Sequence, residues 1–491
     1  MKLKNALVYK PNTAGWILTI SFISMTFIPR SLDDTMFVDG LAYAAIARNM
    51  SHGLGSFWQP HFADSFWLTF NNRCPFFCEH PPLMFGMQAA LFWLFGDTTF
   101  VENFYNLLVL VATVLLLSGV WRLLLRDNDF VRKQTWFPVM MWYGLRVVWW
   151  SMPNNLLDST MAVFCLASVC LQLKAFEKNR QTFYLLVSAG MIVCAGLTKG
   201  PVGLFPIAFP LLYGFVYERR ELITALLRSL ALFLTVALIF SMILLNAPAW
   251  VLLSNYFEGQ VVSALLGHRE KVSNDWTAHF YLARLLFFNI VPHLAILLVL
   301  KLIGKRLKLE GTIRQSSKKL GALALLTSAL IVLPMLASVK QGDYYLMPAM
   351  PFVGLFFAAI TVDVVQAIFS RITVVSWTIM VGMSVLLVCT MAYKLLHQDR
   401  DPTFEIANDL AQIIPSGSKI YLPASISMCS EIHTPFQRYA GLSIAFNAGE
   451  TDYSFLDNPE KCVLDSLRRT GEYRLTALRH GAFLAVRGRE R

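Results

Sequence analysis

The chain has 491 residues, of which 56% are hydrophobic, 13% aromatic and only 15% charged. Its mean hydropathy of +0.53 is too high for several soluble domains and indicates a polytopic helical membrane protein. The formal net charge is +11, but the basic residues fall in short clusters between apolar stretches, so they are topology signals and do not indicate a nucleic-acid partner.

The first apolar stretch, from Trp16 to Pro29, follows three lysines and resembles a signal sequence. No small-residue cleavage pattern follows it, so we expect an uncleaved anchor with its N-terminus in the cytoplasm. Further stretches follow that are long enough to cross a hydrocarbon core of about 30 Å. They lie near residues 101–121, 135–152, 155–176, 181–198, 201–217, 229–253, 281–302, 320–339, 345–367 and 373–396.

One apolar stretch, from Leu83 to Phe95, is too short to span a membrane and is flanked by Pro82 and Gly96. We assign it to an interfacial helix on the membrane surface. With this choice the later basic clusters fall on the same side as the N-terminus, as the positive-inside rule requires. We therefore predict eleven spans, with the N-terminus inside and the C-terminus outside.

The unusual polar segments then gather on the non-cytoplasmic side. They are a first loop of residues 30–100, short turns at 153–158 and 198–201, a loop at 254–279, a turn at 340–344 and a tail from His397. ATP and soluble nucleotide-sugars are cytoplasmic, and the sequence contains no Gly-rich phosphate loop. Neither is an expected direct substrate.

We predict two domains, a membrane domain of residues 1–396 and an extracytoplasmic domain of residues 397–491. The tail is near charge balance and combines a helical candidate, Thr403–Ile414, with a strand-like segment, Lys419–Leu422. This pattern is typical of a small α/β domain.

The eight cysteines divide by location. Four lie in predicted spans, where a cysteine is usually a small apolar packing residue. Cys74 and Cys78 share the first loop, and Cys429 and Cys462 share the tail, so each pair is a candidate disulfide in an oxidising compartment. A metal site at Cys74 and Cys78 is the alternative, although no second pair accompanies them.

Five short motifs occur in order within residues 10–360. They are Asp39-Gly40-Leu41-Ala42-Tyr43-Ala44-Ala45-Ile46-Ala47, Glu79-His80-Pro81-Pro82-Leu83, Leu157-Asp158-Ser159, Leu197-Thr198-Lys199-Gly200-Pro201 and Tyr345-Leu346-Met347-Pro348-Ala349-Met350-Pro351. In order and spacing they resemble the motifs of the polyprenyl-phosphate-sugar glycosyltransferases of the GT-C superfamily, which includes protein O-mannosyltransferases and the lipid A aminoarabinose transferase.

The resemblance implies an all-α GT-C fold and an inverting transferase. Such an enzyme moves a sugar from a polyprenyl-phosphate donor, for example on undecaprenyl phosphate, to lipid A, another glycan, a glycolipid or a protein. It also implies a bacterial inner membrane, with the active site facing the periplasm. At Asp39-Gly40 the chain retains only one carboxylate of the family's acidic pair. His80 replaces a lysine, so it is either protonated by Glu79 or by the lipid phosphate, or it is a metal ligand.

Transfer from such a donor breaks a glycosidic C–O bond with phosphate as the leaving group. The site therefore needs a cation for the phosphate and, for a hydroxyl acceptor, a base. Lys199, beside Gly200, is the first candidate for the phosphate; the alternative is a lysine that extends to the membrane interface. Further phosphate candidates are Lys340 with Tyr344 and Tyr345, His80, and Arg269.

Three carboxylates are candidate catalytic groups. Asp39 is a general base or orients the acceptor, with a helix N-cap for residues 41–50 as the structural alternative. Glu79 is the second, and together with His268 it would suit zinc or manganese, as the resemblance implies for some relatives. Asp158, at the end of a span, is the third, and it is alternatively a residue that positions a neighbouring loop.

Two other classes of protein stay open. A transporter of lipids or lipid-linked sugars would usually show internal repeats and polar residues near the bilayer midplane, and neither is evident here. A membrane-anchored assembly or sensor protein would place its function in the tail. Membrane lipids are expected partners in each case.

Overall fold

The computed structural model describes residues 11–32, 36–64, 75–177, 181–268, 276–306, 315–371, 373–398 and 400–488. The chain divides into two compact units. The helical unit comprises Met1–Pro29 and Asn106–His397, and the mixed unit comprises Arg30–Tyr105 and Gln398–Arg491. The domain boundary predicted after residue 396 stays a prediction.

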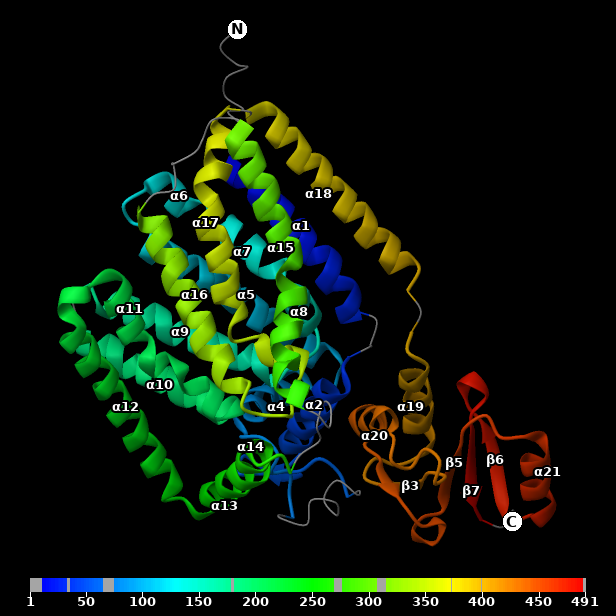
Figure 1. Ribbon diagram of the computed structural model, residues 1–491. Coiled ribbons are helices and arrows are strands. Elements are labelled where there is room, and N and C mark those ends of the chain that lie inside the picture. Colours follow the sequence, from blue (N-terminus) through cyan, green and yellow to red (C-terminus); the bar gives the residue numbers. More distant parts are fainter. Residues whose placement is uncertain are drawn as a thin grey trace. The chain divides into compact units, whose positions relative to one another are not determined.

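Long helices dominate the structure (Figure 1). In the part of the chain that the structure describes, nine helices are long and apolar enough to cross a membrane. They are α1 (Pro11–Leu32), α5 (Phe100–Leu124), α9 (Leu157–Ala175), α10 (Gln181–Lys199), α12 (Leu222–Leu244), α15 (Tyr281–Arg306), α16 (Gln315–Met335), α17 (Met350–Arg371) and α18 (Thr373–Leu396). The protein is therefore a multi-pass membrane protein.

Two of the eleven expected spans are not among these nine helices, because they do not form one long α-helix. Residues 135–152 break into α7 (Trp136–Tyr143) and α8 (Arg146–Ser151). Side chains of α15 bind the backbone at the break: the Val147 N–H donates to Asn289 Oδ1 over 2.8 Å, and His293 Nε2 lies 2.7 Å from the Met141 carbonyl oxygen. These hydrogen bonds satisfy backbone polar groups that the break would otherwise leave unpaired inside the membrane domain.

The second broken stretch, residues 201–217, consists of the 3-10 segment η2 (Pro201–Ala208) and α11 (Phe209–Tyr217). Proline lacks the N–H that an α-helical hydrogen bond needs, and Pro206 and Pro210 lie within this stretch. The expected span at 229–253 is also corrected, because α12 ends at Leu244 and α13 (Ala247–Tyr256) begins after it. Asn246 caps α13 by accepting a hydrogen bond from the Ala249 N–H.

Shorter elements complete the helical unit. They are α6 (Asp129–Lys133), η3 (Arg219–Glu221), the π-helical turn η4 (Phe257–Val262), α14 (Ser263–Leu265), and the 3-10 turns η5 (Trp276–Phe280) and η6 (Asp343–Leu346).

The N-terminal part of the mixed unit contains α2 (Val38–Ser51), a two-stranded hairpin of β1 (Gly55–Ser56) and β2 (Gln59–Pro60), and α4 (Leu83–Phe95). Helices α2 and α4 pack against each other. Helix α4 has the bounds of the short apolar stretch that we assigned to an interfacial helix.

The tail forms a five-stranded sheet with the strand order β4-β3-β5-β7-β6. Its strands are β3 (Lys419–Tyr421), β4 (Ser443–Ala445), β5 (Tyr453–Leu456), β6 (Tyr473–Ala477) and β7 (Phe483–Arg487). Strand β3 is parallel to β4 and β5, whereas β7 is antiparallel to β5 and β6.

Helices α19 (Pro402–Ile413), α20 (Ser430–Pro435) and α21 (Lys461–Thr470) accompany the sheet, with the short turns η7 (Phe436–Ala440), η8 (Ala448–Glu450) and η9 (Arg479–Gly481). The core of the tail contains Leu410, Ile420, Phe436, Ile444 and Leu484. The helix and the strand predicted at its beginning are confirmed as α19 and β3, and so is the α/β character of the tail.

Candidate active site

Lys199 and Asp158 form an ion pair at the ends of two neighbouring spans. Helices α9 and α10 are antiparallel, since Ser168 contacts Ser188 further along the same pair of helices. The last residue of α10 therefore meets the first turn of α9. A cation at a helix C-terminus and an anion at a helix N-terminus both interact favourably with the helix dipole. The two side chains are 12% and 3% exposed, so the pair is largely removed from water.

Two tyrosine rings face the ammonium group of Lys199. Its Nζ atom lies 4.4 Å from the ring centroid of Tyr345 and 4.9 Å from that of Tyr344. The two rings meet edge to face at 5.1 Å, and Trp150 of α8 stacks on Tyr344 at 6.4 Å. An aromatic face attracts a cation electrostatically. The turn η6 thus supplies an aromatic wall to the lysine.

Tyr256, at the end of α13, fixes the backbone at Lys199. Its hydroxyl group donates a hydrogen bond of 2.9 Å to the Lys199 carbonyl oxygen. The next residue, Gly200, has a φ of +81°, and a Cβ atom there would collide with the Tyr256 hydroxyl group. Burial raises the pKa of Tyr256, and the nearby Tyr345 and Asp158 raise it further, so this side chain is a neutral donor.

Gln341 holds the loop before η6 in place. Its Oε1 atom accepts a hydrogen bond of 2.6 Å from the Leu282 N–H. Its Nε2 atom donates to the carbonyl oxygens of His279, Met335 and Ser338. One buried side chain therefore ties the loop to the start of α15 and the end of α16, three residues before Tyr344.

Four of the predicted site residues, Asp158, Lys199, Tyr344 and Tyr345, thus come together in the helical unit. Lys340 lies nearby in sequence and is half-buried, and its backbone exchanges hydrogen bonds with the Ser338 hydroxyl group. His268 is exposed after α14, and Arg269 lies outside the described residues.

The remaining predicted site residues belong to the mixed unit. Asp39 is half-buried in the first turn of α2, whose N-cap is Phe37, so the N-cap interpretation of Asp39 is wrong. Glu79 and His80 are half-buried just before α4. The His80 ring meets Tyr43 of α2 edge to face at 5.7 Å.

The cysteine predictions have different outcomes. Cys78 is disulfide-bonded, and Cys74, its predicted partner, lies outside the described residues. Cys429 and Cys462 are free thiols, so the second predicted pair is wrong. They lie on different elements of the tail, beside α20 and within α21.

A metal site at Glu79 and His268 stays a prediction, and we derive no step through an ion. Among the described residues, no three or more His, Cys, Asp and Glu side chains form a group that could hold a metal ion.

Sequence reasoning missed Trp150, Tyr256 and Gln341. Tyr256 lies in a loop that we predicted, and Gln341 lies in the predicted turn at 340–344, but neither belongs to a motif. Their positions within the predicted loop and turn were the signal that the sequence offered for these two residues.

No protein-family model matches the sequence, and no curated protein matches it either. Among solved structures, ArnT from Cupriavidus metallidurans bound to undecaprenyl phosphate is similar over 96% of this chain and 97% of its own, with a TM-score of 0.63 and 15% identity. The same protein in its apo state gives a TM-score of 0.62 over 96% of this chain and 98% of its own, with 14% identity.

The chain has a GT-C fold. The apo oligosaccharyltransferase of Archaeoglobus fulgidus is also similar, with a TM-score of 0.53 and 10% identity over 92% of this chain and 70% of its own. The fold predicted from the motifs is confirmed. In this GT-C fold, the ion pair of Lys199 and Asp158 with its tyrosine wall is the candidate active site.

Proposed function

We propose that the chain is a membrane glycosyltransferase that moves a sugar from a polyprenyl-phosphate donor to an acceptor. The observation that carries the proposal is the buried pair of Lys199 and Asp158 beneath the rings of Tyr344 and Tyr345. A buried cation at the end of a membrane span suits the phosphate of a lipid-linked sugar. The ArnT structure with a similar fold contains undecaprenyl phosphate, which supports this class of donor.

The proposed reaction is a single displacement. The acceptor oxygen forms a bond to the anomeric carbon while the bond from that carbon to the phosphate oxygen breaks, and its electron pair moves onto the phosphate. Lys199 stabilises the growing negative charge because its ammonium group is held in place before the reaction. The acceptor proton moves to a carboxylate, for which Asp39 and Glu79 are our candidates. Attack opposite to the leaving phosphate inverts the anomeric centre.

Asp158 has a positioning role in this scheme. It holds the Lys199 side chain in one conformation and balances its charge while no donor is bound. The phosphate then gains its cation without the need to order a flexible lysine, which lowers the entropic cost of reaching the transition state.

We further propose that the protein resides in a bacterial inner membrane with this site on the periplasmic face. The acceptor classes that fit are lipid A, another surface glycan, a glycolipid and a protein hydroxyl group.

The test is a donor panel. Purified protein in lipid is incubated with several polyprenyl-phosphate sugars, and the released polyprenyl phosphate is measured. We expect release with one donor and its loss in Lys199→Met. The matched control is Lys174→Met, because Lys174 also lies in the last turn of its helix but is exposed. A folded protein that releases polyprenyl phosphate from no donor would contradict the proposal and favour a transporter.

A further inference from the structure

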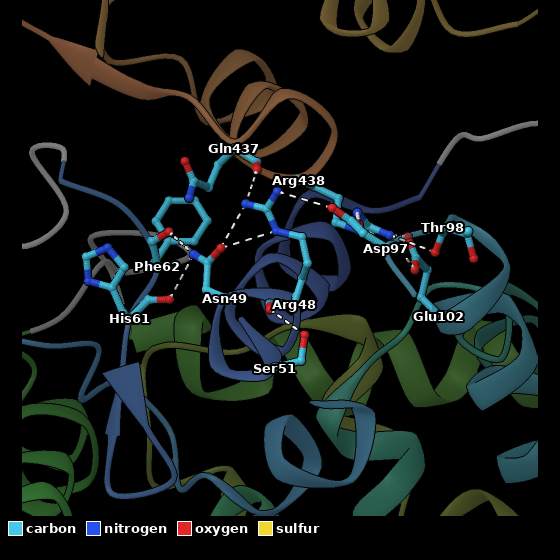
Figure 2. Close-up of polar contacts among 10 residues, drawn as sticks. All are labelled: Arg48, Asn49, Ser51, His61, Phe62, Asp97, Thr98, Glu102, Gln437 and Arg438. Atoms are coloured by element: carbon cyan, nitrogen blue, oxygen red, sulfur yellow. Dashed lines mark hydrogen bonds and ion pairs between the residues drawn. The ribbon is translucent and has the colours of Figure 1, made fainter. Parts of the chain in front are cut away.

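Arg438 of the tail binds two carboxylates of the mixed unit, those of Asp97 before α5 and of Glu102 in its first turn (Figure 2). Its guanidinium group binds both oxygens of Glu102, at 3.0 Å each, through Nε and Nη2. Nη1 donates to Asp97 over 2.8 Å, and Nη2 donates to the Thr98 carbonyl oxygen over 2.9 Å. The planar fork of arginine suits such a bidentate arrangement, which a lysine cannot reproduce.

A second arginine extends this site to α2. Arg48 Nη2 donates to the Gln437 carbonyl oxygen over 3.1 Å, and Nη1 lies 3.5 Å from Asp97 (Figure 2). Arg48 also binds the side chain of Asn49, whose amide group donates to the carbonyl oxygens of His61 and Phe62. The contacts therefore run from the tail through α2 to the segment after β2.

The two arginines and two carboxylates form one charge-balanced network, in which three side chains are buried. Those of Arg438 and Glu102 are each 2% exposed and that of Arg48 is 5% exposed, whereas the Asp97 side chain at the rim is 35% exposed. Burial alone would lower the pKa of Arg438, but Glu102 and Asp97 raise it above its usual value. Removal of one partner from such a network leaves a buried charge uncompensated.

Two further contacts join the tail to the same region. The guanidinium carbon of Arg438 lies 4.9 Å from the ring centroid of Phe92 in α4, and the Asp64 N–H donates to the Ser443 hydroxyl group over 2.9 Å. The elements that the tail contacts are thus α2, which carries Asp39, and α4, which follows Glu79 and His80 directly.

We propose that the tail is an intramolecular clamp and that Arg438 is its positioning residue. By fixing α2 and the turn between α4 and α5, Arg438 sets the positions of Asp39 and Glu79, the carboxylates proposed to receive the acceptor proton. The activity part of this inference rests on the proposed function. The conformational part concerns the mixed unit alone, and its test does not depend on transferase activity.

The conformational test compares hydrogen exchange of the full-length wild type with Arg438→Gln. We expect faster exchange in peptides from residues 36–64 and 75–105 and unchanged exchange in α9 and α10. Arg474→Gln is the matched control, because Arg474 lies on β6 of the same tail and is exposed. Unchanged exchange in a folded Arg438→Gln protein would overturn the clamp. Glu102→Gln changes the acceptor of the same bidentate contact. It replaces Arg438→Gln in the test if that variant does not fold.

The activity test separates positioning from stability. In Arg438→Gln we expect kcat to fall on the order of a hundredfold with a much smaller change in the donor KM, because a misplaced base slows the chemical step. The double variant Arg438→Gln with Glu102→Gln removes both buried charges, so it should regain thermal stability but not kcat. Recovery of both would show that the network serves stability only, and the inference would be wrong. A wild type without transferase activity refutes the proposed function, while the exchange experiment still decides the clamp.

Discussion

The hydroxyl group of Tyr256 donates a hydrogen bond of 2.9 Å to the backbone carbonyl oxygen of Lys199. The ion pair with Asp158 holds the side chain of the same lysine. Backbone and side chain are thus fixed by two different elements, α13 and α9. A cation held in this way is pre-organised, which is the property that electrostatic catalysis needs.

The first prediction concerns the close approach of Tyr256 to Gly200. Gly200→Ala should reduce stability by about 1–2 kcal/mol from the left-handed backbone alone, and the overlap with Tyr256 adds to this cost. Thermal unfolding measures the loss, and donor turnover should fall with it. Gly190→Ala in α10, the helix that ends just before Gly200, is the control, because a Cβ atom there meets nothing within 4 Å and alanine is the better helix former. Equal effects of the two substitutions would refute the close approach.

Much of this arrangement is predictable from the sequence, and the reasons differ by element. Helix α4 was predicted with its observed bounds because Pro82 and Gly96 flank a run that is apolar except for Gln88. Asp158, Lys199 and Tyr345 were each singled out by their motifs, and Tyr344 by its place in the predicted turn at 340–344. Their pairing could not be predicted, since it depends on the antiparallel packing of α9 and α10 and on a turn more than 140 residues further along the chain.

Other features lie beyond local sequence patterns. Residues 135–152 are mostly apolar, so composition favours one span, and the break at α7 and α8 is stabilised by Asn289 and His293 from a distant helix. Arg438 is one arginine among many in a polar tail. Its burial follows from Glu102, which lies 336 residues earlier in the chain.

The second prediction tests the charge balance of the ion pair. Asp158→Ala should destabilise the protein by about 3–5 kcal/mol, because Lys199 is left as a buried charge without its carboxylate. The double variant Asp158→Leu with Lys199→Met should be more stable than the single variant and yet lack transferase activity. Chemical unfolding in detergent measures both proteins. A double variant that turns over donor would show that Lys199 does not bind the phosphate.

The third prediction concerns the aromatic wall. Tyr345→Phe keeps the ring and should stay close to the wild type, whereas Tyr345→Leu removes the cation–π contact of 4.4 Å with Lys199. A contact of about 0.5–2 kcal/mol corresponds to a loss of roughly 2- to 30-fold in kcat/KM. Tyr393→Leu on α18 is the control, since that ring is 63% exposed. If the Phe and Leu variants lose the same activity, the hydroxyl group and not the ring is what matters.

The fourth prediction concerns Gln341 as the anchor of the η6 loop. Gln341→Ala removes four hydrogen bonds, and Gln341→Glu keeps the acceptor for Leu282 but places a carboxylate against three carbonyl oxygens. Both variants should expose the loop, and the Glu variant should be the less stable. Protease cleavage between Ser338 and Tyr344, followed by mass spectrometry, detects the change. Full protection in both variants would mean that the loop is held by its other contacts.

The fifth prediction gives the tail a defined pH dependence. Arg479 binds Asp409 and Glu405 at the surface, and His480 lies 2.7 Å from Glu405. Hydrogen bonding from His480, then the charge of Arg479, lowers the pKa of Glu405, and the hydrogen bond from Arg479 lowers that of Asp409.

A carboxylate with a lowered folded-state pKa contributes stability above its unfolded pKa and loses it as the pH falls. The contacts between α19 and η9 should therefore be intact at neutral pH and weaken below about pH 4. After correction for the intrinsic exchange rate at each pH, protection of the amides in residues 402–413 should decrease in that range, and Asp409→Asn should be less protected than the wild type at pH 7 but not at pH 3. A difference between the two proteins that persists at pH 3 would show that charge is not its cause.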